Sequence, residues 1–152
     1  MVIISKTCSE CGNKSNLING LSYISYNDTD LCSSCAQKLI DKIDKEIIIT
    51  GSDNIEGYKI TEYICVEASE IIIGTGMFME FVGDISDIFE GRSSIFEKNM
   101  KAARQTVTKK LKRIAYEKLG NAIIHFDLDY SEISANRVGI IANGTIVKIE
   151  KI

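Results

Sequence analysis

Four of the five cysteines form two Cys-x-x-Cys pairs, Cys8 with Cys11 and Cys32 with Cys35, and twenty residues separate the pairs. Each pair can turn both sulfurs toward one point, and two such pairs supply the tetrahedral set of thiolates that zinc prefers. A closed shell of four thiolates leaves no coordination position open for a reaction. The spacing therefore predicts a structural Zn²⁺ ion held by these four residues.

The residues around the cysteines predict a small finger over residues 1–45. Gly12 permits the tight backbone of a zinc knuckle. Residues 18–21 are a hairpin signal, and apolar residues follow Cys35 at helical spacing. Knuckle, hairpin and helix in that order resemble a short treble-clef zinc finger. A segment of about 45 residues buries too little apolar surface to fold unaided, which favours a metal-held unit.

Other interpretations of this segment stay open: two disulfides, a dithiol redox site, or iron in the same four thiolates. A finger also raises the question of nucleic acid. Only Lys6 and Lys14 are basic before Lys38, and no aromatic residues alternate with basic ones as a reading surface requires. A finger that is structural, or that contacts a protein partner, is therefore favoured.

A second set of candidate metal ligands is His125, Asp127 and Asp129, which alternate along a predicted strand. An imidazole and two carboxylates suit a hard or borderline metal, and an activated water there would give a metal-dependent hydrolase. Same-side positions on a strand lie about 6 to 7 Å apart, so one ion would need ligands from elsewhere. A solvated or intersubunit face is the simpler interpretation, although copies around a ring could bring these residues together.

Two more side chains carry charge or a thiol. Arg92, beside a predicted helix start, could contact an anion together with free amides, although an intersubunit salt bridge is favoured. Cys65 is expected to be a small buried apolar residue. A Cys–His nucleophile is unsupported, because His125 is the only histidine.

A predicted helix is expected to position the candidate side chains in the second half of the chain. Ser94 and Glu97 have the form of a capping box, and apolar residues recur behind them at steps of three and four. Gly120 is expected to end the helix in the left-handed conformation. The opposite, lysine-rich face is expected to be solvated, with a nucleic-acid surface as the minority interpretation.

From Ala122 the apolar period changes to two, which predicts a strand. One face is expected to carry Ile124, Phe126, Leu128 and Tyr130, and the other Ile123, His125, Asp127 and Asp129. The apolar face must cover something, and the preceding helix is the nearest apolar surface. A helix packed across one face of a sheet follows.

The segment before the helix predicts strands over residues 46–50 and 60–66, and residues 71–73 continue the second or form a third. Residues 77–89 follow helical spacing with a very wide apolar face, which favours burial against another subunit, with a cofactor or a membrane surface as the minority interpretation. Gly74 and Gly76 lack the third glycine of a dinucleotide motif and the lysine of a phosphate-binding loop, so nucleotide binding is excluded.

Composition limits the class of protein. The net charge of −3 gives no overall attraction to nucleic acid or anionic lipid. The apolar runs are too short to span a bilayer, and the N-terminal residues lack the pattern of a signal peptide. The chain is therefore expected in the cytoplasm, where cysteines stay reduced and available to metal.

A set of residues within 46–152 stands in a recognisable order and spacing: Glu56, Gly57, Glu62, Tyr63, Glu70, Gly74, Phe78, Phe81, Asp87, Ile88, Gly91, Arg92, Ser93, Phe96, Glu97, Ala103, Arg104, Leu119, Gly120, Asp127, Asp129, Tyr130, Gly144 and Thr145. In these residues the segment resembles the YbjQ-like family, whose label is heavy-metal binding. Cys65, Ser69 and Glu90 stand where the family commonly has glycine. The N-terminal segment resembles small treble-clef modules that are joined to such domains.

The resemblance implies an α+β fold: a β-α-β-β subunit with its helix on an antiparallel sheet, assembled as a ring-forming homopentamer. It implies no established reaction. The sequence thus favours a non-enzymatic, oligomeric binding or scaffold protein with a structural zinc finger, in which the ring binds a metal, a ligand or a protein partner. The alternatives are the metal-dependent hydrolase and a nucleic-acid-binding protein that uses the finger and the basic helix.

Overall fold

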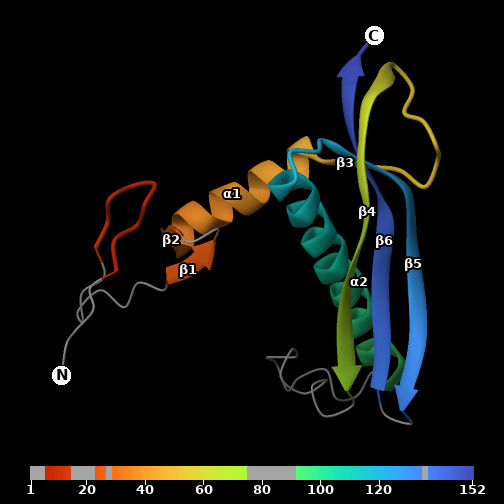
Figure 1. Cartoon of the computed structure of the whole chain (residues 1–152). Coiled ribbons are helices and arrows are strands. Elements are labelled where there is room, and N and C mark those ends of the chain that lie inside the picture. The colour runs from red at the N-terminus through yellow and green to blue at the C-terminus, as the bar shows by residue number, and fades with distance from the viewer. Residues whose placement is uncertain (1–5, 15–22, 27–28, 75–91, 135–136) are drawn as a thin grey trace, which may run out of the picture. The chain divides into compact units, whose positions relative to one another are not determined.

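In the computed structural model of the chain, the structure describes residues 6–14, 23–26, 29–74, 92–134 and 137–152 (Figure 1). The chain divides into two compact units, Met1–Lys45 and Glu46–Ile152. The elements, in chain order, are β1 (Tyr23–Tyr26), β2 (Thr29–Cys32), α1 (Ser33–Glu46), β3 (Ile48–Ile49), β4 (Tyr58–Gly74), α2 (Arg92–Glu117), β5 (Ala122–Ser134) and β6 (Arg137–Lys151). Neither described helix is long and apolar enough to cross a membrane.

The first unit contains a hairpin and a helix. Strands β1 and β2 pair antiparallel, and α1 follows β2 directly. The helix predicted after Cys35 is confirmed: Ala36 and Ile43 of α1 are buried, seven residues or two turns apart. The hairpin turn predicted at residues 18–21 lies outside the described residues.

The second unit is a four-stranded sheet in the order β3-β5-β6-β4 with α2 across one face (Figure 1). Strands β4 and β5 each pair antiparallel with β6, which confirms the predicted α+β class and the β-α-β-β order. The short strand predicted at residues 46–50 is present as β3. It pairs parallel to β5, so the sheet is mixed rather than purely antiparallel.

In the segment between β3 and α2, one of the two predicted alternatives for residues 71–73 is confirmed, a continuation of the preceding strand. Residues 60–66 and 71–73 belong to a single strand, β4, whose pairing with β6 is irregular near Thr61 and Ile64. The wide apolar face predicted at residues 77–89 lies outside the described residues.

The core lies between α2 and the sheet. Val107 and Leu111 of the predicted apolar stripe are completely buried, and the stripe continues through Ala115, also completely buried, rather than through the predicted Ile114, which is partly buried. They cover the sheet face that carries Ile123, Ile140, Ala142 and Ile146, which are also completely buried. Burial of each large aliphatic side chain contributes about 1.5 to 3 kcal/mol, so this layer determines where α2 lies.

One polar side chain lies inside this layer. Ser69 of β4 is 6% exposed, and its hydroxyl donates a hydrogen bond of 2.7 Å to the carbonyl oxygen of Val107. Such a hydroxyl needs a partner, because an unpaired buried polar group costs about 1 to 3 kcal/mol. The hydroxyl of Ser69 therefore ties β4 to the middle of α2.

The alternation of β5 is interrupted by a bulge. Ile124 pairs with Thr145 and Asp127 with Asn143, so one extra residue of β5 stands between these two pairs. Ile124 therefore shares a face with Asp127 and Asp129, and the predicted grouping of side chains across this point is wrong. The main-chain N–H groups of His125 and Phe126 donate instead to the carbonyls of Ser52 and Thr50, which stabilises the bulge.

Both ends of α2 differ from their predictions. The helix begins at Arg92, so Ser94 lies within its first turn rather than at the cap. At the other end Leu119, not Gly120, has the left-handed backbone, with φ of +62°. The N–H of Leu119 donates to Tyr116 and that of Gly120 to Ala115, which is the bond pattern of a Schellman motif.

Gly120 is required for a different reason. A Cβ atom at this position would overlap Cγ2 of Ile146, whose side chain is completely buried. The glycine therefore allows α2 to approach β6 closely.

This arrangement predicts opposite effects for adjacent substitutions. Leu119→Gly removes a side-chain penalty in the left-handed region and should raise the free energy of unfolding by about 0.5 to 1 kcal/mol. Gly120→Ala should lower it by about 1 to 3 kcal/mol through overpacking against Ile146. Urea unfolding followed by circular dichroism measures both. Stabilisation by Gly120→Ala together with destabilisation by Leu119→Gly would contradict this assignment.

Candidate metal centre

The first Cys-x-x-Cys pair lies in a tight knuckle. The N–H of Cys8 donates to the carbonyl of Asn13 at 2.8 Å, and the N–H of Gly12 donates back to the carbonyl of Cys8 at 2.9 Å. Gly12 has φ of +73°, a conformation that a residue with a side chain rarely adopts. Cys8 and Cys11 are thus held on one turn, as their spacing predicted.

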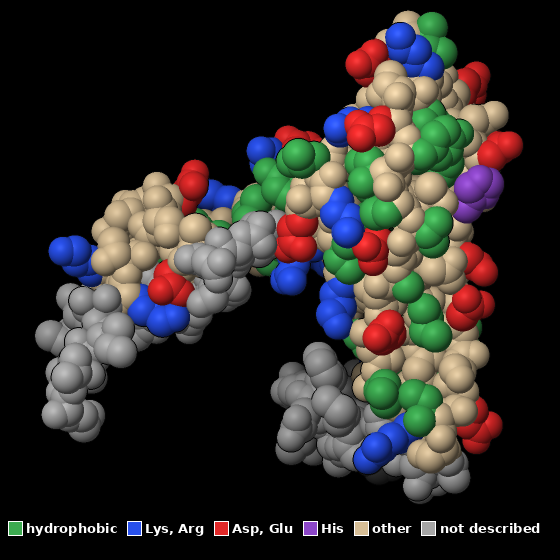
Figure 2. Space-filling view, viewed as in Figure 1, with side chains coloured by type: hydrophobic (Ala, Val, Ile, Leu, Met, Phe, Trp, Pro, Cys, Tyr) green, Lys and Arg blue, Asp and Glu red, His purple; other side chains and the backbone are tan. Residues whose placement is uncertain are grey.

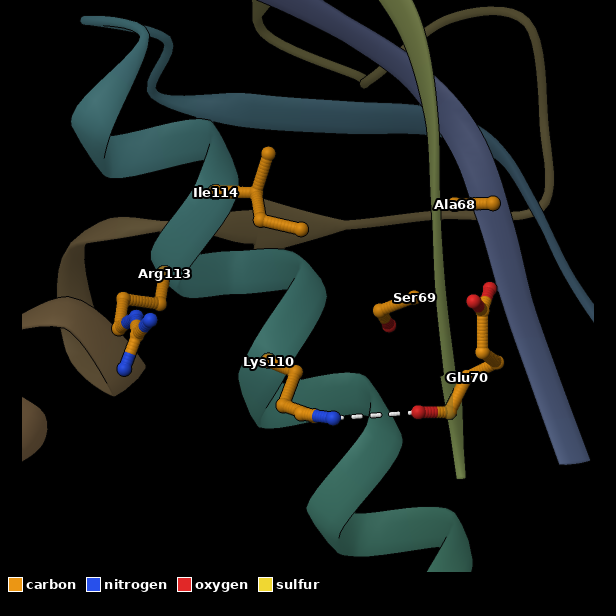
Figure 3. A pocket seen from close by; sticks show the side chains of 6 residues that line it. All are labelled: Ala68, Ser69, Glu70, Lys110, Arg113 and Ile114. Atoms are coloured by element: carbon orange, nitrogen blue, oxygen red, sulfur yellow. Dashed lines mark hydrogen bonds between the residues drawn. The ribbon is translucent and has the colours of Figure 1, made fainter. Parts of the chain in front are cut away.

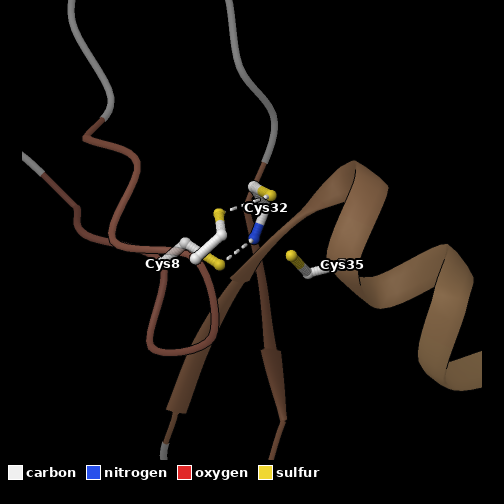
Figure 4. Close-up of side chains that lie close together, drawn as sticks. Cys8, Cys32 and Cys35 are labelled. Carbon is white, nitrogen blue, oxygen red and sulfur yellow. Dashed lines mark hydrogen bonds between the residues drawn. The ribbon is translucent and has the colours of Figure 1, made fainter.

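The second pair is carried by the junction of β2 and α1. Cys32 is the last residue of β2, and Cys35 lies in the first turn of α1. The N–H of Cys32 donates to Sγ of Cys8 at 3.3 Å, so the main chain of one pair contacts a sulfur of the other (Figure 4). An ion pair of 2.8 Å between Lys6 and Asp30 also joins the knuckle to β2.

The four sulfur atoms converge. The Sγ atoms of Cys8, Cys11, Cys32 and Cys35 all lie within 4.8 Å of one another, and those of Cys11 and Cys32 are 3.7 Å apart. Zinc–sulfur bonds of about 2.3 Å in a tetrahedron require sulfurs about 3.8 Å apart. All four thiols are free rather than bonded in disulfides. The donor set and its spacing fit a tetrahedral Zn²⁺ ion.

The electrostatics of the cluster favour a cation. Hydrogen bonds from the main chain, that of Cys32 first and that of Cys11 second, lower the pKa of Cys8 to about 6. The neighbouring sulfurs of Cys32 and Cys11 raise the pKa of Cys35 to about 12. One thiol is therefore anionic at neutral pH while another keeps its proton. A divalent cation among the sulfurs would replace the proton that Cys35 shares in hydrogen bonds with the sulfurs of Cys32 and Cys11.

The cluster is also the core of its unit. Cys8, Leu31, Cys32 and Ala36 form the buried set, with Cys35 and Leu39 packed against it. Three of these six residues are candidate ligands, so little apolar packing would be left without them. This composition is typical of a site that holds the fold together.

His125, Asp127 and Asp129 do not converge. His125 is exposed at the bulge with φ of +51°, and Asp129 accepts a hydrogen bond of 3.0 Å from Nδ2 of Asn143. Among the described residues, the cysteine cluster is the one group of three or more His, Cys, Asp or Glu side chains placed to share a metal ion. The structure gives a second metal at these residues no geometric support.

The other two candidate residues from the sequence are Arg92 and Cys65. Arg92 is the first residue of α2, and its side chain lies outside the described part of the chain. Cys65 is half-buried rather than buried, and its Sγ lies 4.0 Å from Oε1 of Glu67. Glu67 forms an ion pair of 2.9 Å with Lys118 and raises the pKa of that lysine.

A pocket beside β4 was not anticipated from the sequence. It has a volume of about 220 Å³ and is lined by Ala68, Ser69, Glu70, Lys110, Arg113 and Ile114. Lys110 points from α2 toward β4 and donates to the main-chain carbonyl of Glu70 at 3.1 Å, while the Glu70 carboxylate points away (Figure 3). About forty residues separate its two walls, so no local pattern could reveal it.

Substitution of single cysteines should separate the cluster from the fifth thiol. Cys8→Ser removes one of four ligands, and the purified protein should lose most of about one metal ion per chain. Cys65→Ser is the matched control and should keep its metal. Elemental analysis of both variants provides the measurement, and equal metal content in the two would contradict the assignment.

Comparison with known proteins concerns the second unit. Residues 47–150 match the model of the family described as "Putative heavy-metal-binding". A UPF0145 protein of Carboxydothermus hydrogenoformans is 32% identical over 104 residues, which cover 68% of this chain and 97% of the relative. The UPF0145 protein GK1405 of Geobacillus kaustophilus is 33% identical over 104 residues, 68% of this chain and 99% of the relative.

A crystal structure of a protein of unknown function from Pediococcus pentosaceus, assigned to the DUF74 family, is 18% identical with a TM-score of 0.38, and the match covers 68% of this chain and 98% of that one. The four clustered cysteines precede the region matched by the family model. With two relatives above 30% identity and a model match across the second unit, the chain belongs to the YbjQ-like family over residues 47–150.

Proposed function

We propose that this chain is a non-enzymatic, oligomeric binding protein of the cytoplasm. Residues 1–45 form a treble-clef finger around one structural Zn²⁺ ion, and residues 46–152 assemble with further copies into a ring. The finger is the surface proposed to contact a protein partner. The observation that carries the proposal is the convergence of four free cysteine sulfurs within 4.8 Å.

Zinc is favoured over the other occupants of this cluster. Two disulfides would have required paired sulfurs, and all four thiols are free. Iron binds the same four thiolates, but Zn²⁺ is the common ion of closed four-cysteine sites that only hold structure. The order of knuckle, hairpin β1–β2 and helix α1 supports a treble-clef arrangement. A reducing cytoplasm keeps such thiols available to metal.

Assembly is supported by exposed apolar side chains on the strands. Tyr63, Val66 and Ile72 of β4 are 69%, 75% and 55% exposed, and Tyr130 and Ile133 of β5 are about half exposed. Strands β4 and β5 lie on opposite sides of β6, and exposed apolar side chains commonly mark contact surfaces, so two such surfaces are indicated. A ring of several copies, a pentamer by resemblance to the family, would cover them.

The two alternative functions have weaker support. A hydrolase that uses His125, Asp127 and Asp129 needs ligands that converge, and these three do not. A nucleic-acid surface would use the lysines of α2. Lys110 of α2, however, donates to the main chain of β4, and Lys118, which follows the helix, is paired with Glu67.

Removal of the metal should unfold one unit and spare the other. After treatment with a zinc chelator, we expect protease cleavage within residues 1–45 to accelerate by an order of magnitude or more, because metal binding supplies most of the folding free energy of such a finger. Residues 46–152 should stay resistant, since their core contains no proposed ligand. Mass spectrometry of the fragments measures both.

The identity of the metal is tested on the same preparation. A colourless protein that contains zinc is expected, whereas iron in four thiolates absorbs visible light. Cleavage that is unchanged after complete metal removal would show that the metal is not structural.

Assembly is tested by the mass of the native protein. Multi-angle light scattering of the metal-loaded chain should give a single species of more than two copies, with five expected. A monomer at concentrations of tens of micromolar would contradict the assembly and leave the zinc proposal standing.

A further inference from the structure

The sheet of the second unit has two outer edges that no described strand covers completely. Strand β4 ends the strand order and pairs only with β6. On the other side, β3 covers β5 at Ala122 and Ile123, and residues 50–52 extend this cover to Phe126. Beyond Phe126, β5 has no neighbour on that side within the described chain. Edges that no strand covers are templates for another strand, although on β4 the carbonyl of Glu70 already accepts one bond, from Lys110.

The directions of the main-chain groups on these edges can be worked out. The carbonyl of Glu70 accepts a bond from Lys110 and so points outward from β4. Residues two apart on a strand point their main-chain groups to the same side, so Val66, Ala68 and Ile72 also face outward. On β5 the N–H of Phe126 points outward, to the carbonyl of Thr50. The main-chain groups of Leu128, Tyr130 and Glu132 therefore also point outward.

The residues of β4 whose main-chain groups point outward carry their side chains on one face of the sheet, and the corresponding residues of β5 carry theirs on the opposite face. Ala68 and Glu70 pair with Asn143 and Ile141, on the face away from α2. Leu128 and Tyr130 pair with Ala142 and Ile140, the buried residues beneath α2.

These directions select the mode of pairing. In a parallel pair, a residue whose main chain points to the neighbour stands opposite one whose main chain points away, with both side chains on one face. Parallel pairing of β4 with β5 of another copy therefore places α2 of both copies on the same side of a continuous sheet. Antiparallel pairing would place the two helices on opposite sides.

Apolar exposure concentrates on the same strands. Of eight exposed large apolar side chains in the described residues, five belong to β4 or β5: Tyr63, Val66, Ile72, Tyr130 and Ile133. Apolar side chains are visible over the sheet in Figure 2, and acidic ones follow its β5 side. Asp127, Asp129 and Glu132 of β5 are exposed. The two edge strands β4 and β5 therefore carry most of the exposed large apolar side chains of the described residues.

The pocket beside β4 lies at one of these edges. Its volume of about 220 Å³ is below the 300 to 1,000 Å³ of typical small-molecule sites, and suits a single large side chain. It opens between β4 and α2, on the α2 side of the sheet (Figure 3). Tyr130, which is 48% exposed, lies on that same side of β5, at its other edge. The ammonium group of Lys110 in the pocket wall is a suitable neighbour for an aromatic ring.

We propose that copies join head to tail by parallel pairing of residues 127–134 of one copy with residues 66–72 of β4 in the next, and that Tyr130 enters the pocket beside that β4. The pocket is then completed by the neighbouring copy. Because different surfaces meet at each contact, repetition closes a ring when the rotation permits. This inference rests on the proposed assembly and names its interface.

The test compares the native mass of the metal-loaded full chain with that of three variants. Tyr130→Ala empties the pocket, and Ala68→Pro removes an outward N–H that the β4–β6 ladder does not use. Both should weaken association at least tenfold and give monomers at a concentration where the wild type is assembled. Leu119→Ala, which truncates an exposed apolar side chain outside both edges, is the matched control and should keep the wild-type mass.

The outcomes separate the inference from the assembly. An assembled wild type whose Tyr130→Ala and Ala68→Pro variants keep its mass on dilution overturns the interface and leaves the assembly intact. A wild type that stops at two copies overturns head-to-tail pairing, and a monomeric wild type removes both proposals. Circular dichroism verifies folding, and if Ala68→Pro does not fold, Tyr130→Ala decides.

Discussion

The crowding of four sulfur atoms around one point is the constraint on which the first unit depends. These sulfurs lie within 4.8 Å of one another, and hydrogen bonding with the sulfurs of Cys32 and Cys11 raises the pKa of Cys35 to about 12, while main-chain hydrogen bonds lower that of Cys8 to about 6. Three of the four cysteines, Cys8, Cys32 and Cys35, make up half of the small core of that unit. A divalent cation resolves both difficulties, because it accepts the negative charge and replaces missing apolar packing. The knuckle, the hairpin and the first turn of α1 are arranged around this point.

The second unit needs no such ion, since α2 and the sheet bury a continuous aliphatic layer. Its sheet, however, has two edges that no described strand covers: the edge of β4 and the edge of β5 beyond Phe126. The two units therefore pose different physical problems, one of charge and one of unpaired backbone. The family description of heavy-metal binding applies to the matched residues 47–150, whereas the four-cysteine cluster precedes them. The metal site proposed for this chain therefore lies outside the residues that match the family.

The sequence predicts those features that depend on the spacing of residues close together in the chain. Two Cys-x-x-Cys pairs and a helical apolar stripe identify the cluster and α2, because both patterns are set within a few turns of chain. The left-handed Leu119 was not predictable, because glycine stood beside it and is needed for close contact with Ile146. The bulge at His125 depends on carbonyls of Ser52 and Thr50, more than seventy residues earlier. The pocket depends on the pairing of α2 with β4, which no single segment encodes.

The central claim is that four cysteine sulfurs surround one zinc ion. X-ray absorption at the zinc edge of the purified full-length chain tests it most directly, because it counts the atoms bound to the metal and measures their distances. The account predicts four sulfur neighbours at about 2.3 Å and no oxygen or nitrogen ligand. A zinc ion bound by nitrogen or oxygen atoms, or by fewer than four sulfurs, would contradict it.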